Sequence, residues 1–291
     1  MLFDTHCHLN FEAFDGKVGE VIEQAKQNGV NQIVIPGTDV TTSEKAIAIA
    51  EKNEGAYAAV GIHPHHVFEI FKARERNFLS QRGPLHPESE KNSIPSLSKL
   101  LSNPKVVAIG EIGIDRHIYQ KTKYPDYKIA EEFVELQKIL LIEQIKLANK
   151  YKKSLIFHNR EAKKDVLEVL ADLTEGSTRG STPTTDYRSV FYCCEPDPDL
   201  LEFAKAHKMF IGVDGDVTYS EAKQEFIKSV PLEMLVLETD SPFLTPVPYR
   251  GQENEPKNIK VIAEFVAKLK GISVEKVENQ TTENARRLFR L

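Results

Sequence analysis

The sequence contains no tryptophan and few cysteines, and positive charge is not in excess in its 291 residues. Cys7, Cys193 and Cys194 form an odd set that includes a vicinal pair, which argues against a disulfide framework and favours a reducing, cytoplasmic compartment. The formal net charge is −5. A protein with this charge cannot attract nucleic acid by its overall field, so any affinity for phosphate must be local.

Long apolar stretches are also missing. No run approaches the length of a membrane span, and the opening residues lack the basic segment and apolar stretch of a signal peptide. With 41% hydrophobic and 28% charged residues, the composition is that of a globular chain. We therefore expect a folded protein without a membrane segment.

Short apolar runs occur instead, and helix-like segments separate them. Near-continuous apolarity is typical of parallel strands that are buried on both faces. The runs cover residues 2–3, 33–35, 57–60, 106–109, 155–157, 189–192, 210–213 and 234–237. The clearest helical patterns cover 126–151 and the segment after Pro256. Strands that alternate with helices in this way predict an α/β fold, the (β/α)8 TIM barrel.

Two stretches interrupt the alternation. Residues 72–96 are rich in charge, Pro and Ser, and residues 174–185 are rich in Gly, Ser and Thr. We interpret both as surface insertions in a single domain over 1–291, because the alternation of strands and helices continues past each of them. Limited proteolysis is expected to cut 174–185 first.

Polar residues gather where the apolar runs end. His6 and His8 follow the first run, Glu111 the fourth, His158 the fifth and Asp240 the eighth. Each has a structural explanation when taken alone, as a turn residue, a cap or a buried hydrogen-bonding group. Taken together they predict a metal site, because the carboxyl ends of barrel strands converge and these nitrogen and oxygen ligands suit zinc, manganese or magnesium.

Several motifs together resemble the TatD family of metal-dependent deoxyribonucleases. In chain order they are DTHCH (4–8), GIHPH (61–65), GEIGID (110–115), HNR (158–160), ETDSP (238–242), PYRG with NEP (248–256) and QTTENARRLF (280–289). The resemblance implies a TIM barrel of the amidohydrolase type, a binuclear divalent-metal centre and hydrolysis of DNA phosphodiesters. It also implies that His6, His8, Glu111 and Asp240 bind one ion, and that Glu111 and His158 bind a second.

The resemblance fails at one ligand position. The family segment that reads roughly His-Cys-Phe-Ser-Gly corresponds to residues 192–196, so Tyr192 stands where a histidine is expected. A neutral phenol is a poor ligand at pH 7. We therefore expect one tightly held ion and a weaker second one, with Cys194 as an alternative soft ligand.

The expected reaction uses a water activated by the metal, with Asp240 and Glu111 as catalytic residues. Asp240 would orient the water and accept its proton, and His63, Arg160 and Arg250 would contact the phosphate. Arg160 has an alternative role as the partner of a nearby acid. The expected substrate is DNA, as single strands or ends rather than long duplexes.

Two rival functions remain open at this stage. One is a metal-dependent ester or amide hydrolase, such as a D-aminoacyl-tRNA deacylase, and the other is a non-catalytic binding protein with a decayed metal centre. One barrel fold serves many chemistries, so the fold cannot separate them. The oligomeric state is also open.

Overall fold

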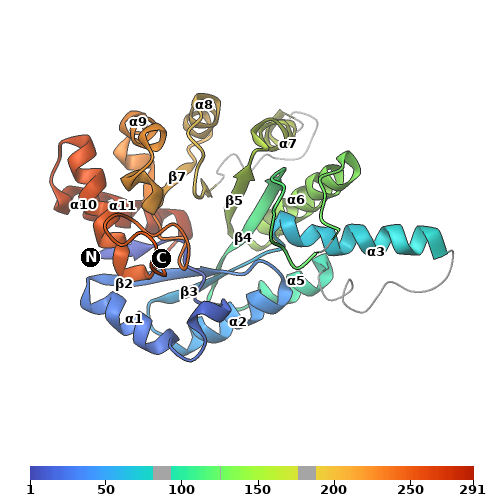
Figure 1. Ribbon diagram of the computed structural model, residues 1–291, viewed down its shortest axis with the longest axis horizontal. Coiled ribbons are helices and arrows are strands. Elements are labelled where there is room, and N and C mark those ends of the chain that lie inside the picture. The colour runs from blue at the N-terminus through green and yellow to red at the C-terminus, as the bar shows by residue number, and fades with distance from the viewer. Residues whose placement is uncertain (81–92, 125, 176–187) are drawn as a thin grey trace.

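Parallel strands form one eight-stranded sheet in the computed structural model, which describes residues 1–80, 93–124, 126–175 and 188–291 (Figure 1). The order in the sheet follows the order in the chain, from β1 to β8. The strands are β1 (Leu2–Asp4), β2 (Val30–Pro36), β3 (Ala56–Val60), β4 (Val106–Asp115), β5 (Ser154–Arg160), β6 (Ser189–Phe191), β7 (Phe210–Val213) and β8 (Leu235–Leu237). Each predicted run contributes to a strand, and the TIM-barrel prediction is confirmed.

The segments that follow β1 and β8 bring the two edges of the sheet together. The amide of Thr5 donates to Leu237 O over 3.0 Å, and the amide of Asp240 donates to His6 O over 2.9 Å. The sheet is thus a nearly closed barrel. Its closure places His6 directly beside Asp240, although 233 residues separate them in the chain.

Alternate side chains of each strand point into the barrel or outward to the helices. The inward layer receives one residue from every strand: Phe3, Val34, Ala59, Ala108, Ile156, Val190, Phe210 and Val236. Helix α11 (Val274–Phe289) adds Leu288 and Phe289 to the same cluster, and the Phe289 ring lies 5.8 Å from that of Phe3. Side chains from α11 therefore close the amino-terminal end of the barrel.

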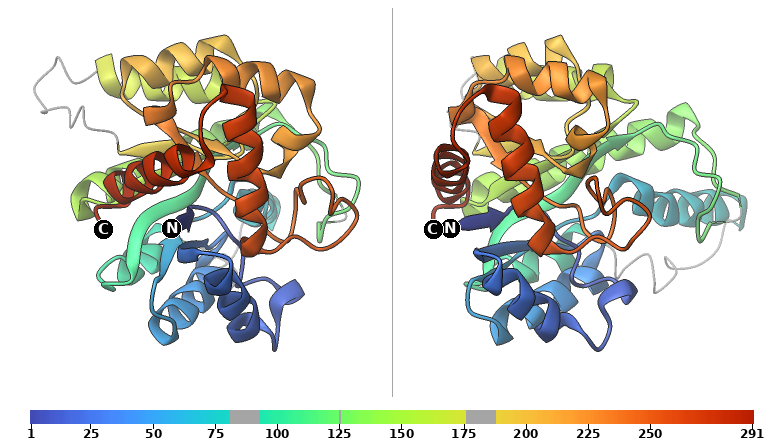
Figure 2. Two further views of the ribbon diagram at one scale, coloured as in Figure 1. Left: turned by 90° about the vertical axis from the view of Figure 1, so that its left-hand side faces the viewer. Right: turned by 60° about the vertical axis from the view of Figure 1, so that its left-hand side comes forward.

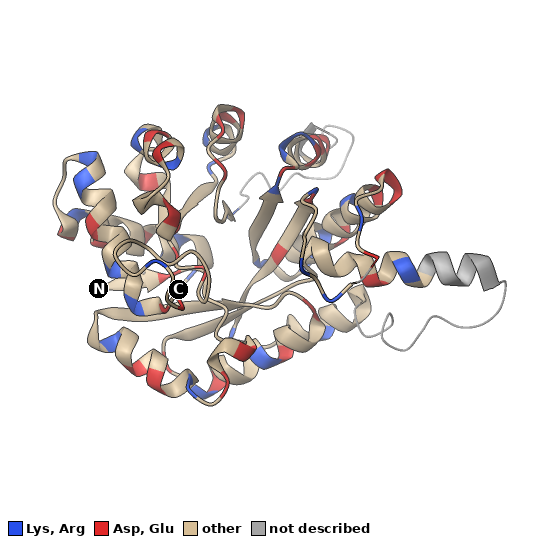
Figure 3. Cartoon of the chain, viewed as in Figure 1, with Lys and Arg blue, Asp and Glu red and all other residues tan. Residues whose placement is uncertain are grey.

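Helices cover the outside of the barrel, where a second apolar cluster packs them against the strands (Figures 1 and 2). Besides α11, the helices that bear on the argument are α1 (Val18–Gln27), α2 (Val40–Lys52), α3 (Val67–Ser80), α5 (Ile94–Leu100), α6 (Glu131–Tyr151), α7 (Lys163–Glu175), α8 (Pro198–Ala206), α9 (Glu221–Ser229) and α10 (Ile259–Lys270). Lys, Arg, Asp and Glu are interspersed along these outer helices (Figure 3).

One predicted helix begins later than its apolar pattern suggests. The segment 126–151 is helical only from Glu131, because Ala130 adopts an extended conformation and accepts the first helical hydrogen bonds. Before it, Tyr127 packs against Phe68 of α3 with the ring centroids 5.0 Å apart. Tertiary packing thus holds these residues outside the helix. The helix predicted after Pro256 is α10, which ends at Gly271 in the left-handed conformation.

Parts of the two predicted insertions belong to helices. In the first insertion, residues 72–80 continue α3 and 94–96 begin α5, and in the second, residues 174–175 end α7. Residues 81–92 and 176–185, where the proteolysis prediction also falls, lie outside the described residues. Among the described residues, no helix combines the length and apolarity of a membrane span.

Candidate metal centre

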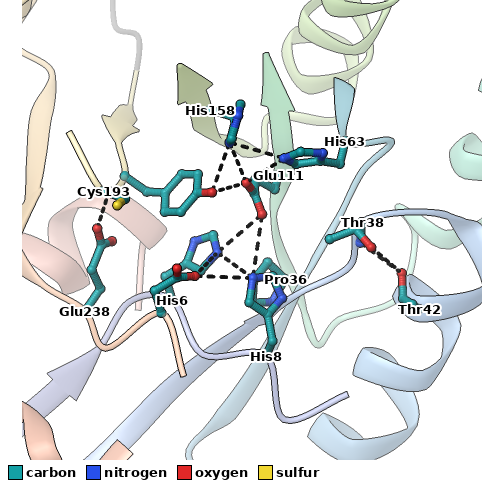
Figure 4. A network of polar contacts seen from close by, with 12 residues as sticks. His6, His8, Pro36, Thr38, Thr42, His63, Glu111, His158, Cys193 and Glu238 are labelled. Carbon is teal, nitrogen blue, oxygen red and sulfur yellow. Dashed lines mark hydrogen bonds and ion pairs between the residues drawn. The ribbon is translucent and has the colours of Figure 1, made fainter. Parts of the chain in front are cut away.

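Glu111 lies at the centre of a group of histidines at the carboxyl ends of the strands (Figure 4). Its two carboxylate oxygens face two different clusters. His6, His8 and Asp240 surround one oxygen, and His63, His158 and Tyr192 surround the other. Glu111 belongs to β4, and these other side chains come from β5 or from the segments that follow β1, β3, β6 and β8.

The nitrogens of the first cluster lie close to each other and to both neighbouring carboxylates. His6 Nε2 lies 3.2 Å from His8 Nε2. Glu111 Oε2 is 3.5 Å from the first nitrogen and 3.7 Å from the second, and Asp240 Oδ1 is 3.7 Å and 3.5 Å from them. Ligand atoms bound to zinc at 2.0–2.2 Å are roughly 3.3–3.6 Å apart in a tetrahedron. Two nitrogens and two carboxylate oxygens at these distances fit a divalent cation.

The protonation of two of these groups also suits a cation. Burial lowers the pKa of His6, which favours the neutral imidazole. Burial opposes ionisation of Glu111, but His63, His158 and His6 together hold its pKa well below the usual range. Metal ligands are neutral imidazoles and ionised carboxylates. His8 differs, because Asp240 raises its pKa against the effect of burial, which favours the protonated imidazole.

The second cluster contains a phenol at one corner. His63 Nε2 and His158 Nδ1 lie 3.0 Å and 2.8 Å from Glu111 Oε1 and 3.2 Å from each other. The Tyr192 hydroxyl donates to the same Glu111 oxygen and lies 3.0 Å from His158 Nδ1. Burial raises the pKa of Tyr192 well above its usual range, so the hydroxyl keeps its proton. A neutral O–H group thus occupies space among the donor atoms.

Asp115 holds His158 from the side opposite Glu111. Its Oδ2 accepts from His158 Nε2 over 2.9 Å and from the Tyr119 hydroxyl over 2.7 Å. Burial alone would lower the pKa of His158, but Asp115 and Glu111 raise it to about 9. A carboxylate behind a ligating imidazole fixes its tautomer and ring orientation. Asp115 therefore points Nδ1 of His158 at the second cluster.

A pocket of about 620 Å³ opens over both clusters. Arg160 lines it, with its guanidinium 5.2 Å from the centre of the Tyr119 ring. Arg250 does not line this pocket and instead lies 3.8 Å from the centre of the Tyr219 ring. His63, which the sequence analysis assigned to phosphate, lines the pocket and also faces Glu111. The two arginines thus have different access to a ligand in the pocket.

The structure directs two other polar residues away from the clusters. The thiol of Cys194 is buried in the outer apolar core and lies 3.5 Å from Glu195 O, so this residue packs rather than faces the ligand atoms. Glu238 accepts from the Cys193 amide over 2.5 Å and from Thr5. It braces the end of β6 against β8.

Some residues of the pocket wall carry no sequence signal for their position. Lys223 of α9 is 1% exposed, and its Nζ donates to Cys194 O over 2.7 Å and lies 3.4 Å from Asp214. Phe11 and Phe243 also line the pocket. The sequence predicts that a lysine in a charged helix is exposed and that the two phenylalanines are buried in the core. Their place in the pocket wall is therefore evident only from the fold.

Buried clusters of histidines and carboxylates lie at the carboxyl ends of the barrel strands. This arrangement is characteristic of metal-dependent hydrolases. The model of the TatD related DNase family matches residues 3–290. The chain therefore belongs to the TatD family.

Relatives and solved structures agree with this assignment. The chain is 33% identical to the uncharacterized metal-dependent hydrolase YabD of Bacillus subtilis, with 100% of both chains covered. It is 29% identical to the uncharacterized metal-dependent hydrolase YcfH of Escherichia coli K12, with 100% of this chain and 96% of the relative covered. The crystal structure of YjjV, a TatD homolog from Escherichia coli K12, matches with a TM-score of 0.77 and 26% identity and covers 100% of this chain and 98% of its own.

Proposed function

We propose that the protein is a deoxyribonuclease that hydrolyses DNA phosphodiesters with a divalent cation bound by His6, His8, Glu111 and Asp240. The first cluster carries the proposal, since its histidine nitrogens and carboxylate oxygens lie within 3.2–3.7 Å of one another in the pairs that involve His6 or His8, and His8, Glu111 and Asp240 line the same pocket as Arg160. The family model, described as TatD related DNase, supports DNA as the substrate. The candidate metals are zinc, magnesium and manganese.

A bound divalent cation supplies Lewis acidity, which makes water acidic enough to be a nucleophile at neutral pH. Asp240 is 9% exposed, more than His6, His8 or Glu111, and it lines the pocket. Its carboxylate is the acceptor for the proton that the attacking water loses. Glu111 connects the two clusters, because each of its two carboxylate oxygens faces one of them.

Arg160, beside the second cluster, orients the scissile phosphate in this proposal, because the donors of the cluster itself are engaged with one another. The Tyr192 hydroxyl is already committed to Glu111, and His158 is fixed by Asp115. Arg160, with a guanidinium always positive, lines the pocket and offers charge-assisted hydrogen bonds to phosphate oxygens. Arg250 is exposed outside that lining, so its contact with phosphate is to a neighbouring nucleotide.

Free Cys7, Cys193 and Cys194 support the cytoplasmic location within this proposal. Within this proposal, residues 1–291 form a single domain that contains the barrel. The formal net charge of −5 supports single strands or DNA ends as substrates over long duplexes.

The decisive experiment loads the purified protein with each candidate metal and presents three substrates side by side. These are a labelled single-stranded oligonucleotide, the matching blunt duplex and a D-aminoacyl-tRNA. The proposal requires nucleotide release from the single strand, loss of release in excess chelator and no deacylation. Deacylation alone would establish the ester hydrolase instead, and turnover of none of the three would establish a binding protein.

A further inference from the structure

Two aromatic rings form a shelf beside the first metal cluster. Phe11 stacks on the ring of His8, with centroids 4.3 Å apart and an interplanar angle of 19°. Phe243 lies edge-on to both, 6.2 Å from Phe11 and 6.5 Å from His8. Both phenylalanines line the metal pocket. We refer to Phe11 and Phe243 as the aromatic shelf.

Phe243 is 51% exposed, although it is a large apolar side chain at the edge of a buried site. Its backbone is well anchored. The Phe243 amide donates to Asp240 O over 2.8 Å, and the buried side chain of Asn254 donates to Phe243 O over 2.7 Å and to Thr239 O over 2.9 Å. The exposed ring is thus presented on a fixed turn, as a preorganised binding residue is.

We propose that the aromatic shelf binds the unpaired base of the nucleotide next to the phosphate at the metal centre. This inference rests on the proposed function and deepens it by naming how the substrate is selected. Every base has an apolar face that stacks on an aromatic ring without regard to sequence. Since Phe243 adjoins the ring of His8, a base on the shelf belongs to a nucleotide adjoining the scissile bond.

A cation in the same pocket suits the phosphate that accompanies a base. Arg160 lines the pocket together with Phe11 and Phe243, so one cavity offers both a ring for a base and a cation for a phosphate. A base inside a duplex is stacked on both faces and paired, so it cannot reach the shelf. The shelf therefore selects single strands and frayed ends.

The test uses the metal-loaded protein and a single-stranded phosphorothioate oligonucleotide, which resists cleavage, with 2-aminopurine as its terminal base. Stacking quenches 2-aminopurine fluorescence, so binding at the shelf is measured without turnover. One oligonucleotide carries the probe at the 3′ end and another at the 5′ end. A third places the probe in a blunt duplex.

We expect quenching with one of the two single strands and none with the duplex. Phe243→Ala should remove the quenching and weaken binding about 5- to 150-fold, the range for loss of one base–aromatic stack. Phe243→Trp should restore both. Tyr249→Ala is the matched control, because Tyr249 is 41% exposed on the same segment but does not line the metal pocket. This variant should quench the fluorescence of the probe as strongly as the unmodified protein does.

Quenching that survives Phe243→Ala, or its absence with both single strands, would overturn the shelf. Cleavage of an unmodified oligonucleotide is measured in parallel, which separates the two proposals. Cleavage without quenching would refute the shelf and leave the hydrolytic function intact. Quenching without cleavage would support the shelf and refute the deoxyribonuclease activity.

Discussion

The two sides of Glu111 differ in one corner of their donor sets. On the first side, His6, His8 and Asp240 complete a set of four donor atoms with Glu111 Oε2. On the second side, His63 and His158 approach Glu111 Oε1, but the remaining corner holds the hydroxyl of Tyr192. The two sides share one carboxylate and comparable burial, and the corner that holds Tyr192 is a clear chemical difference between them.

This comparison shows that the two candidate metal sites offer unequal sets of donor atoms. Tyr192 brings a proton, whereas the histidine expected at its position would bring a lone pair. The phenol also stacks on His6, with ring centroids 4.0 Å apart and planes within 7° of each other. It therefore supports the first side by packing while it reduces the donor capacity of the second.

Removal of a first-side ligand should have the largest effect. His6→Ala, Glu111→Ala and Asp240→Ala should each lower the hydrolytic rate by more than the roughly 10- to 100-fold of an outer-shell change, and excess chelator should abolish it. Metal content by mass spectrometry should fall with the rate. His207→Ala, which removes a histidine at the end of α8, serves as control. Full activity in excess chelator would contradict the proposed reaction.

Asp115→Asn should come next, with a loss of roughly 10- to 100-fold in activity or metal affinity, since it weakens the support of His158 from behind. The second side should be affected first, so titration with metal should show weaker binding there and unchanged binding at the first side. Equal losses on both sides would mean that Asp115 acts on the fold as a whole.

Tyr192→His should make the two sides alike. The unmodified protein should hold one ion per chain tightly, and the variant should approach two, with a higher hydrolytic rate. Tyr192→Phe is the matched control, because it removes the hydroxyl without adding a nitrogen donor and should leave the stoichiometry near one. Two equally tight ions in the unmodified protein would refute this explanation of the second side.

The two arginines should give the smallest and most graded effects. Arg160→Ala should raise KM for oligonucleotides more than Arg250→Ala, because Arg160 lines the pocket and Arg250 is exposed beyond it. A surface contact with phosphate contributes about 1 kcal/mol or less, which corresponds to a few-fold change for Arg250. The reverse order, measured by steady-state kinetics on one oligonucleotide, would place the scissile phosphate near Tyr219.

The sequence predicted the strands well because both faces of a barrel strand are buried and leave continuous apolar runs, as in 106–109. It also indicated His6, His8 and Asp240, because several potential ligands follow such runs and the carboxyl ends of barrel strands converge. It placed His63 at the same site, but as a phosphate contact, and only the structure shows that its Nε2 lies 3.0 Å from Glu111. The burial of Lys223 and the exposure of Phe243 were equally hidden, since both arise from tertiary packing.

The start of α6 shows another limit of local sequence patterns. Ile129 and Phe133 have helical spacing, yet the helix begins only at Glu131. Tyr127 and Tyr124 pack against Phe68, and this contact between distant segments outweighs the local preference for a helix. The spacing of apolar residues indicates which side chains are buried. Whether their backbone is helical depends on the tertiary contacts that those side chains make.

The side chains of α11 that close the amino-terminal end of the barrel limit the path by which a polymer can reach the pocket. Phe289 packs against Phe3 at that end, and the metal pocket lies at the opposite end. A polymer must therefore enter and leave the pocket at the same end of the barrel. It cannot pass through the barrel from one end to the other. If the protein cleaves DNA as proposed, the shortened strand would have to withdraw or shift along the outer face after each cut before its next bond could reach the candidate metal site.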